Sequence, residues 1–285
     1  MTHTQEWTQP AGEVLRAGAG FRLADVDPRS TPGFAGRKAD AAAVLAAGAE
    51  RLGELQERLF AQSAVGAAEG AVLLVLQAMD TAGKGGIVRH VVGAVDPQGV
   101  ELASFKKPTP EELAHDFLWR IRPRLPDAGR IGVFDRSHYE DVLIGRVRAL
   151  APTPEIERRY GAITAFEREA ADRGIRLVKV MLHISKDEQR ARLAERLERP
   201  DKHWKFNPGD IDERELWDAY MDAYQVAIER TSTPQAPWFV VPADRKWYAR
   251  LAVQQLLIDA LASLDPQWPA ADYDVAAQQA RLAAS

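Results

Sequence analysis

The chain has 285 residues, of which 46% are hydrophobic and 27% charged, so it can form one large α/β domain or two small ones with a sizeable core. Its net charge of −4 argues against a general nucleic-acid-binding protein, although it can conceal local basic clusters. The absence of cysteine excludes disulfides, thiolate catalysis and cysteine metal sites. The first residues lack an apolar signal core, and no stretch approaches the roughly 20 apolar residues of a membrane span. We therefore expect a cytoplasmic protein without membrane attachment.

Two segments precede the first predicted strand. Residues 1–36 contain Pro10, Pro28, Pro32 and several glycines, so we expect an extended arm that runs over the surface. A helix is predicted from about Lys38 to Gln62, where leucines recur on one stripe at helical spacing.

The run 71–76 is short and continuously apolar, which is typical of a strand buried on both faces of a parallel sheet. A glycine-rich turn follows it, and from Ile87 onward apolar residues recur at helical spacing. This order is the context of a phosphate-binding loop, in which backbone N–H groups and a helix N-terminus face phosphate oxygens. Lys84 would add a full charge, whereas the alternative is a glycine-rich turn with an exposed lysine. The loop residues predicted to contact phosphate are Thr81, Ala82, Gly83, Gly85 and Gly86.

The loop departs from the Walker A pattern G-x-x-x-x-G-K-[ST] at two positions. Ala78 occupies the first glycine position, and Gly85 stands where a hydroxyl normally binds Mg²⁺. Another oxygen ligand is therefore required, and Asp80 inside the loop is the candidate. A carboxylate here would repel a phosphate unless a cation lay between them, so Asp80 predicts a metal site.

A second strand is predicted over residues 99–105, and it leads into Lys106 and Lys107 before prolines stop the regular structure. The next helix is expected to begin near Glu111. Two adjacent lysines are often only a solvated surface feature. Parallel sheets, however, bind ligands at the carboxyl ends of their strands, so these lysines are also candidate phosphate ligands.

A third strand, residues 130–135, ends in Asp135. A hydrophobic strand that ends in an acid is the Walker B arrangement, in which the acid reaches the Mg²⁺ held by the phosphate loop. Arg136 would direct its guanidinium at the same anion. Ser137 and Glu140, three residues apart, could instead form only a capping box at the start of the next helix.

Residues 153–172 are predicted to be helical, and residues 176–184 form a fourth buried strand, in which His183 is expected to be a core histidine rather than a catalytic base. The segment from about 186 to 230 holds the densest basic cluster, and its helix–loop–helix pattern has the form of a lid that closes over phosphates. Interleaved glutamates leave open a solvated, self-paired helix. The basic lid residues, of which the three arginines recur on one helix face, are Arg192, Arg196, Arg199, Lys202 and Lys205.

A fifth strand at 238–241 and a final helix through about Leu264 complete the predicted elements, and the tail after Asp265 is expected to be loosely packed. Strands alternate with helices throughout, which indicates one doubly wound α/β domain. We therefore expect a P-loop kinase-like three-layer fold with a central parallel sheet of about five strands and a helical lid. The predicted divisions are an arm at 1–36, the kinase domain at 37–265 and a tail at 266–285.

These parts assemble into a phosphoryl-transfer site. Lys84 and the loop amides would hold one polyphosphate group, and Asp80 with Asp135 would hold Mg²⁺, or Mn²⁺ in its place. Arg136 and the lid arginines would neutralise charge on the transferred phosphoryl group. The basic residues after the second strand and on the lid exceed the need of an ordinary nucleotide, which indicates a long, highly charged substrate.

Several motifs, in order along the chain, resemble the polyphosphate kinase 2 family. They are Gln-Ala-Met-Asp-Thr-Ala-Gly-Lys-Gly-Gly (77–86), Ser-Phe-Lys-Lys-Pro-Thr (104–109), Phe-Asp-Arg-Ser-His-Tyr-Glu-Asp-Val-Leu (134–143), Lys-His-Trp-Lys-Phe (202–206) and Val-Pro-Ala-Asp-Arg-Lys (241–246). The similarity covers roughly residues 20–265. It implies a P-loop kinase fold with a helical lid that transfers phosphoryl groups between inorganic polyphosphate and AMP, ADP, ATP or other nucleotides. It also implies a need for Mg²⁺ and a homo-oligomer, such as a dimer or tetramer.

The resemblance also implies roles for individual residues. Those that match the catalytic set of the family are Asp80, Lys84, Asp135, Arg136 and Arg196. Those that match its basic polyphosphate tract are Lys106, Lys107, Lys202 and Lys205. The turn Ser-His-Tyr-Glu-Asp (137–141) looks most like the branch that accepts AMP as well as ADP, which makes Glu140 a candidate acceptor residue. Relatives commonly have Asn where this chain has Asp135.

Two other functions remain open. A nucleoside or nucleotide kinase that uses ATP as donor would share the loop, the second acid and the lid, and would be active without polyphosphate. A non-catalytic nucleotide- or nucleic-acid-binding regulator would use the basic lid as a docking face, but the negative net charge argues against nucleic acid as a partner.

Overall fold

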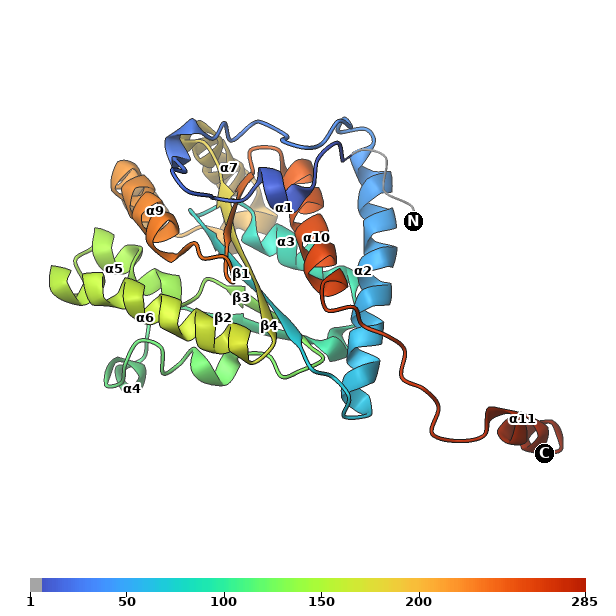
Figure 1. Ribbon diagram of the computed structural model, residues 1–285. Helices are drawn as coiled ribbons and strands as arrows, with labels where there is room; N and C mark the ends of the chain where they lie inside the picture. Colours follow the sequence, from blue (N-terminus) through green and yellow to red (C-terminus); the bar gives the residue numbers. More distant parts are fainter. Residues whose placement is uncertain (1–6) are drawn as a thin grey trace.

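The computed structural model describes residues 7–285, and its centre is a five-stranded sheet (Figure 1). The strands are β1 (Ala71–Ala78), β2 (Val100–Ser104), β3 (Ile131–Asp135), β4 (Ile175–His183) and β5 (Trp238–Pro242). They lie in the order β2-β3-β1-β4-β5, and every neighbouring pair is parallel. The predicted parallel sheet of about five strands is therefore confirmed.

β1 is the central strand, between β3 and β4. All its residues up to Gln77 are buried, which explains why this stretch is apolar at nearly every position instead of alternating. Leu76 lies opposite Asp135 on one side and Val180 on the other. Because parallel strands end at the same edge of the sheet, the phosphate loop after β1 and Asp135 at the end of β3 are neighbours.

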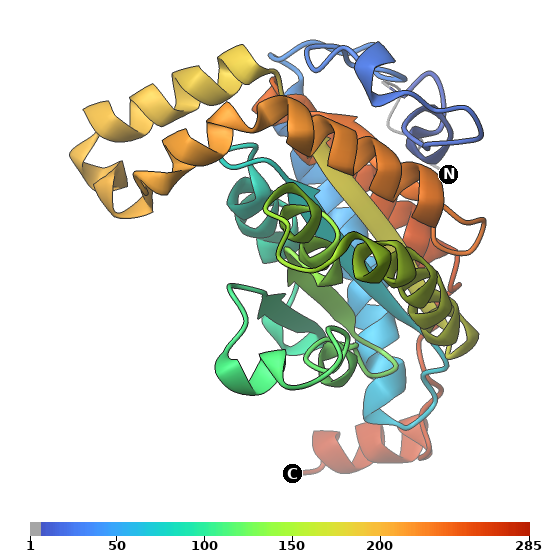
Figure 2. The same ribbon diagram turned by 90° about the vertical axis from the view of Figure 1, so that its left-hand side faces the viewer.

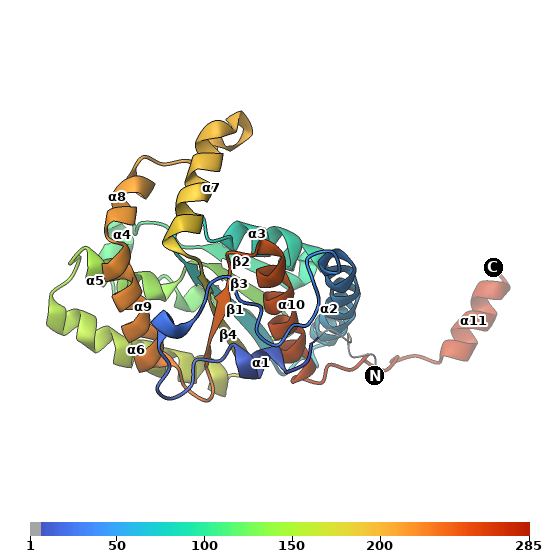
Figure 3. The same cartoon turned by 90° about the horizontal axis from the view of Figure 1, so that it is seen from above.

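Helices cover both faces of the sheet and give the three layers that the sequence predicts (Figures 1 and 3). α2, α3 and α10 pack on one face, and α5, α6 and α9 pack on the other. The helices on the first face and at the two termini are α1 (Ala11–Val14), α2 (Ala41–Ala64), α3 (Lys84–His90), α10 (Lys246–Ala262) and α11 (Val275–Ala283). The remaining helices are α4 (Pro110–Leu113), α5 (Ile144–Val147), α6 (Thr153–Asp172), α7 (Lys186–Glu198), α8 (Gly209–Glu215) and α9 (Trp217–Thr231).

The segment predicted as a lid, residues 186–230, takes in α7, α8 and nearly all of α9, but α9 packs against α6 as part of the body. Figures 2 and 3 show α7 and α8 projecting from the body beside the carboxyl ends of the strands. Ser185 caps the start of α7, and its hydroxyl accepts a hydrogen bond from the Glu188 amide at 3.1 Å while it donates to Asp244 at 2.8 Å. The base of α7 is thereby tied to the loop after β5.

Residues 7–36 run along the body and add side chains to its core. Leu15, Ala17 and Leu23 are buried, and Arg16 forms an antiparallel bridge with Phe239 of β5. Residues 7–36 therefore contribute to the core, whereas the sequence predicted an extended arm that runs over the surface. At the other terminus the chain leaves the body after Pro266, which is buried, and α11 buries no residue (Figure 1). Within residues 7–285, no helix has both the length and the apolar character needed to cross a membrane.

Candidate functional site

The loop after β1 spans residues 79–83 and leads directly into α3, whose first residues are Lys84, Gly85 and Gly86. Thr81 has a φ of 67°, which is uncommon for a non-glycine residue, and Gly83 has a φ of 122°, which favours glycine. Lys84 is the first residue of α3, and its Nζ donates to the Ala78 carbonyl at 3.3 Å, so the ammonium group lies over the loop. Within residues 7–285 the buried hydroxyl of Thr81 has no hydrogen-bond partner.

Asp135 ends β3, and Arg136 begins the turn that follows. Arg136 has a left-handed φ of 64°, a conformation that costs about 1–3 kcal/mol for such a residue. Its Nη2 lies 3.1 Å from Asp80 Oδ1, and its Nη1 lies 3.9 Å from Glu140 Oε2. Burial opposes the charge of Arg136, but Glu140 and Asp80 outweigh it and raise the pKa of the guanidinium. The structure thus brings Asp80, Arg136 and Glu140 together.

A cleft of about 700 Å³ opens over the phosphate loop and is lined by loop residues, Asp135 and Arg136. Basic side chains reach it from the loop, from α3, from the end of β2, from the lid and from α10. These are Lys84, Arg89, Lys106, Arg196, Lys202, Lys205, Lys246 and Arg250. Burial, together with the charges of Arg250 and Arg89, lowers the pKa of His90, which also lines the cleft. A cleft lined by so many basic side chains suits a polyanionic ligand.

Three of these basic residues, Arg89, Lys246 and Arg250, were not predicted as site residues. Lys246 and Arg250 lie four residues apart on α10 and therefore share a face, which was the signal available in the sequence. Burial and the charge of Arg89 lower the pKa of Arg250. Lys246 lies 3.7 Å from Glu195, but Arg89 and Arg250 have no ion-pair partner among residues 7–285. Two such cations beside a cleft favour an anionic ligand.

A smaller cleft of about 250 Å³ lies between the phosphate loop, the turn after β3, α8 and α9. Glu140 lines it, as do the buried Tyr220 and Tyr224 of α9. Asp210 of the lid also lines it, and this residue was not predicted as part of the site. Asp80, Arg136 and Asp210 line both clefts, so the two clefts meet there.

Arg192 does not face either cleft, and its prediction as a phosphate ligand needs correction. The side chain is buried on α7, and Nη1 donates to the carbonyls of Thr81 and Ala82 at 3.0 and 2.8 Å. Nη2 donates to the carbonyls of Ala243 and Asp244 at 2.7 and 3.1 Å. Its Nε donates to Glu188 Oε1 at 2.7 Å, so the guanidinium is occupied by protein oxygens and supports the phosphate loop instead of facing a ligand.

The other basic residues predicted for the site differ in their positions. Arg196 lines the larger cleft, where it donates to the Lys205 carbonyl at 3.1 Å and lies 3.3 Å from Asp210. Arg199 is exposed, pairs with Glu195 and Asp201, and lines neither cleft. Lys107 is also exposed and lies outside both clefts. We therefore retain Arg196 as a site residue and leave out Arg199 and Lys107.

The capping box suggested for Ser137 and Glu140 is not formed. Ser137 Oγ accepts a hydrogen bond from the Tyr139 amide at 3.2 Å and another from Gln77 Nε2 at 3.1 Å. The carboxylate of Glu140 is directed at Arg136 instead of the helix start. Burial raises the pKa of Glu140, and Arg136 and Lys84 act against this rise. Glu140 is thus free to act in the smaller cleft.

His183 is buried at the end of β4 and lines neither cleft, in agreement with its interpretation as a core histidine. Burial lowers its pKa, which favours the neutral form.

The acids near the loop fit a divalent cation that is shared with a phosphate ligand. Asp80 and Asp135 both line the larger cleft, and Mg²⁺ is commonly held by one or two carboxylates together with substrate phosphates. Within residues 7–285 there is no cluster of three histidine, aspartate or glutamate side chains that could hold a metal alone. The orphaned hydroxyl of Thr81 offers one more oxygen in the same loop.

Comparison with known proteins identifies the family. The sequence model described as "Polyphosphate kinase 2 (PPK2)" matches residues 38–269. The chain belongs to the polyphosphate kinase 2 family. The AMP/ADP-polyphosphate phosphotransferase of Meiothermus ruber is 48% identical over 249 residues, which cover 87% of this chain and 91% of that protein. The ADP-polyphosphate phosphotransferase of Rhodopseudomonas palustris is 46% identical over 232 residues, which cover 77% of this chain and 78% of that protein.

A solved structure confirms the fold of this polyphosphate kinase 2 family member. The crystal structure of polyphosphate kinase 2 from Arthrobacter aurescens TC1 is 61% identical and superimposes with a TM-score of 0.96, covering 98% of this chain and 99% of that chain. The predicted P-loop kinase-like α/β class is therefore confirmed. The names of the two relatives differ in the acceptor, so family membership alone does not assign it.

Proposed function

We propose that this protein is a polyphosphate-dependent nucleotide phosphotransferase that moves a phosphoryl group between inorganic polyphosphate and AMP or ADP. The observation that carries this proposal is the meeting of a basic cleft and a smaller cleft at Asp80 and Arg136. A phosphoryl group can pass between two substrates only where they touch, and substrates bound in the two clefts would meet beside these two residues. The names of the relatives support both classes of substrate.

Polyphosphate would lie in the larger cleft. Its basic side chains come from elements on both sides of the phosphate loop, and a single nucleotide would not need so many. Lys106 at the end of β2, Arg196 on the lid and Arg250 on α10 would each offset charge along the chain of phosphates.

The nucleotide acceptor would enter the smaller cleft. Tyr220 and Tyr224 supply aromatic surface there, and Glu140 lies beside Arg136 where the acceptor phosphate would approach. A terminal oxygen of that phosphate would attack the terminal phosphorus of polyphosphate. One P–O bond forms, the terminal P–O–P bond breaks, and the polyphosphate becomes one unit shorter.

The residues at the junction provide the charge that this transfer needs. A bound Mg²⁺, for which Mn²⁺ could substitute, would be held by Asp80 and Asp135 and would neutralise charge on the phosphates. Lys84 and Arg136 would donate to oxygens whose charge grows as the phosphoryl group leaves. Closure of α7 and α8 over the cleft would exclude water, which otherwise competes as acceptor.

The decisive experiment mixes purified protein, Mg²⁺, long-chain polyphosphate and either AMP or ADP, and follows ADP and ATP by chromatography. We expect product only when polyphosphate is present. Activity with ATP as the sole donor would favour the ATP-dependent kinase, and tight binding without turnover would favour the regulator. Light scattering of the same sample tests the proposed dimer or tetramer.

A further inference from the structure

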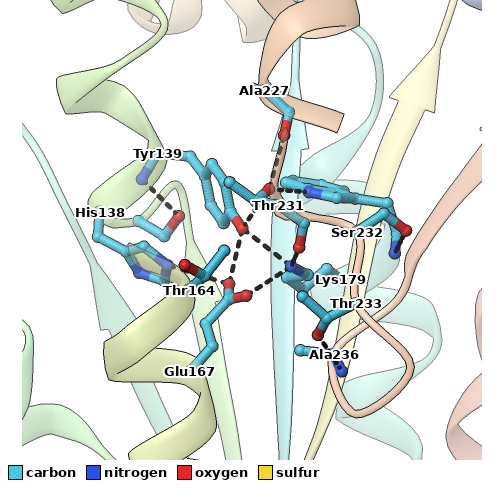
Figure 4. Close-up of polar contacts among 12 residues, drawn as sticks. His138, Tyr139, Thr164, Glu167, Lys179, Ala227, Thr231, Ser232, Thr233 and Ala236 are labelled. Carbon is cyan, nitrogen blue, oxygen red and sulfur yellow. Dashed lines mark hydrogen bonds and ion pairs between the residues drawn. The ribbon is translucent and has the colours of Figure 1, made fainter. Parts of the chain in front are cut away.

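A buried polar network includes His138 and Tyr139, which lie between Arg136 and Glu140 in the turn after β3 (Figure 4). At its centre is Lys179 of β4, which is fully buried and has its Nζ 2.6 Å from Glu167 Oε2 of α6. The same ammonium group donates to Tyr139 Oη at 2.9 Å and to the Thr231 carbonyl of α9 at 2.8 Å. All three of its protons are therefore used.

The second oxygen of Glu167 binds the turn itself. Oε1 accepts a hydrogen bond from Tyr139 Oη at 2.7 Å and lies 3.3 Å from His138 Nε2. The Tyr139 ring also packs edge-on against Trp238 of β5, with ring centroids 4.6 Å apart. Two strands and two helices thus hold two consecutive residues of one short turn.

The two ends of this turn face the smaller cleft, and its middle is buried. Arg136 and Glu140 line the smaller cleft, whereas Ser137, His138 and Tyr139 between them are fully buried. Arg136 has the left-handed backbone described above, and such a conformation persists only where the surroundings determine it. The three buried residues are the part of the turn that neighbouring strands and helices hold in place.

We infer that the Lys179–Glu167 ion pair, acting through Tyr139 and His138, fixes the position of this turn. It thereby holds Arg136 in contact with Asp80 and keeps Glu140 next to Arg136. Lys179 and Glu167 are then positioning residues for the phosphoryl transfer, and in this respect the inference rests on the proposed function. Neither residue lines either cleft.

A contribution to folding stability does not by itself explain why a lysine and a glutamate are buried at this position. The cost of removing both charges from water largely offsets their attraction, and apolar pairs of similar volume often give equal or greater stability. An apolar pair cannot orient a phenol and an imidazole. Lysine and glutamate together supply donors and acceptors in fixed directions, which is what a strained catalytic turn requires.

The first test removes one hydroxyl and no charge. Tyr139→Phe keeps the ring packing but removes the hydroxyl that joins the turn to Lys179 and Glu167, while His138 keeps its contact with Glu167. We expect kcat for polyphosphate-dependent transfer to fall about tenfold or more, with the polyphosphate KM within about twofold, because Arg136 acts mainly in the transition state. Tyr248→Phe is the matched control, since its hydroxyl donates to the Pro32 carbonyl at 2.7 Å outside both clefts. It should lower Tm by a similar amount and leave kcat unchanged.

A double-mutant cycle identifies the route of the effect. If the network acts through Arg136, Tyr139→Phe should lower kcat much less in the Arg136→Lys background than in the parent, whereas independent effects multiply. A folded Tyr139→Phe variant with parental kcat, or losses that multiply in the cycle, would overturn the inference.

A second test does not depend on turnover. The variant Lys179→Met/Glu167→Leu replaces the ion pair by apolar side chains, and we expect it to fold with a Tm close to the parent. In its crystal structure Arg136 should leave the left-handed region and lose its contact with Asp80. Arg136 unmoved would contradict the inference even if the parent proved inactive with polyphosphate, a result that would remove only the proposed function.

Discussion

Arg192 and Arg196 lie one helical turn apart on α7, yet their surroundings give them different tasks. Arg192 is buried against four backbone carbonyls of the phosphate loop and the loop after β5. Arg196 is partly exposed in the larger cleft. The same side chain can therefore hold the phosphate loop in shape at one position and meet a ligand at the next.

This difference predicts opposite outcomes for two alanine variants. Arg192→Ala leaves buried carbonyls without a donor, so we expect the free energy of unfolding to fall by about 2–4 kcal/mol, measured by urea denaturation. Arg196→Ala should keep the parental stability and instead raise the polyphosphate KM several-fold. A destabilised Arg196→Ala variant with unchanged KM would show that this arginine, too, is structural.

We propose that Lys84 and Asp80 carry the chemistry of the phosphate loop, and neither side chain is part of the buried core. We expect Lys84→Ala and Asp80→Asn each to slow phosphoryl transfer by ~10³ or more while far-UV circular dichroism is unchanged. The rate loss follows from removing one positioned charge at the phosphates in the first variant and at the proposed metal in the second. Parental turnover in either folded variant would refute the site.

Glu140 is the candidate for acceptor choice, because it lies beside Arg136 in the smaller cleft and does not cap a helix. AMP presents its α-phosphate and ADP its β-phosphate, so the shorter acceptor needs Arg136 held at a different depth. We expect Glu140→Asn to lower kcat with AMP far more than with ADP, measured at saturating polyphosphate. Equal losses with both acceptors would assign Glu140 to general positioning of Arg136.

At the scale of elements, α10 extends the basic surface beyond what the phosphate loop and lid provide. The double variant Lys246→Ala/Arg250→Ala should raise the KM for long polyphosphate several-fold, with little effect on the KM for ADP. Arg173→Ala/Arg176→Ala is the charge-matched control, because both arginines are exposed near the amino end of β4 and lie outside both clefts. The increase in the KM for polyphosphate should be larger at higher salt, because at physiological ionic strength screening shortens the reach of the remaining charges to about 8 Å. Equal KM values in both variants would exclude α10 from the polyphosphate path.

The elements differ in how far the sequence could predict them. The strand at 71–76 and the acid at 135 were predictable, because burial on both faces and Walker-type patterns leave marks within a few residues. The orientation of the Arg192 side chain was not predictable. Helical periodicity shows which residues share a face of one helix, but not which face packs against another part of the protein. Arg250 lies far along the chain from the phosphate loop, and only the folded chain brings the two to one cleft.

At the scale of the whole molecule, the strand order explains why the site is where it is. β1 and β3 are neighbours at the centre of the sheet, and their carboxyl ends bring the phosphate loop and the turn after Asp135 together. β4 and α6 provide the buried network behind that turn. The sheet therefore holds the residues of the candidate site, and we expect the projecting α7 and α8 to move when substrate binds.

The same view separates the body from its C-terminal tail, and this leads to the last prediction. Residues 271–285 are all exposed, and α11, with nine residues, is shorter than the roughly 12–15 residues that an isolated helix needs for stability. The family match ends at residue 269, and Pro266 is still buried, so the proposed end of the domain at 265 falls just short of the packed chain. A truncation after Ala270 should therefore change Tm by less than about 2 °C and leave kcat unchanged, as measured by calorimetry and the nucleotide assay. Removal of residues 7–36 is the opposite case, since it uncovers Leu15 and Leu23 and should unfold the protein. If the C-terminal truncation instead lowered Tm by more than about 5 °C, the tail would have to pack against another copy of the chain, and light scattering would show the change in mass.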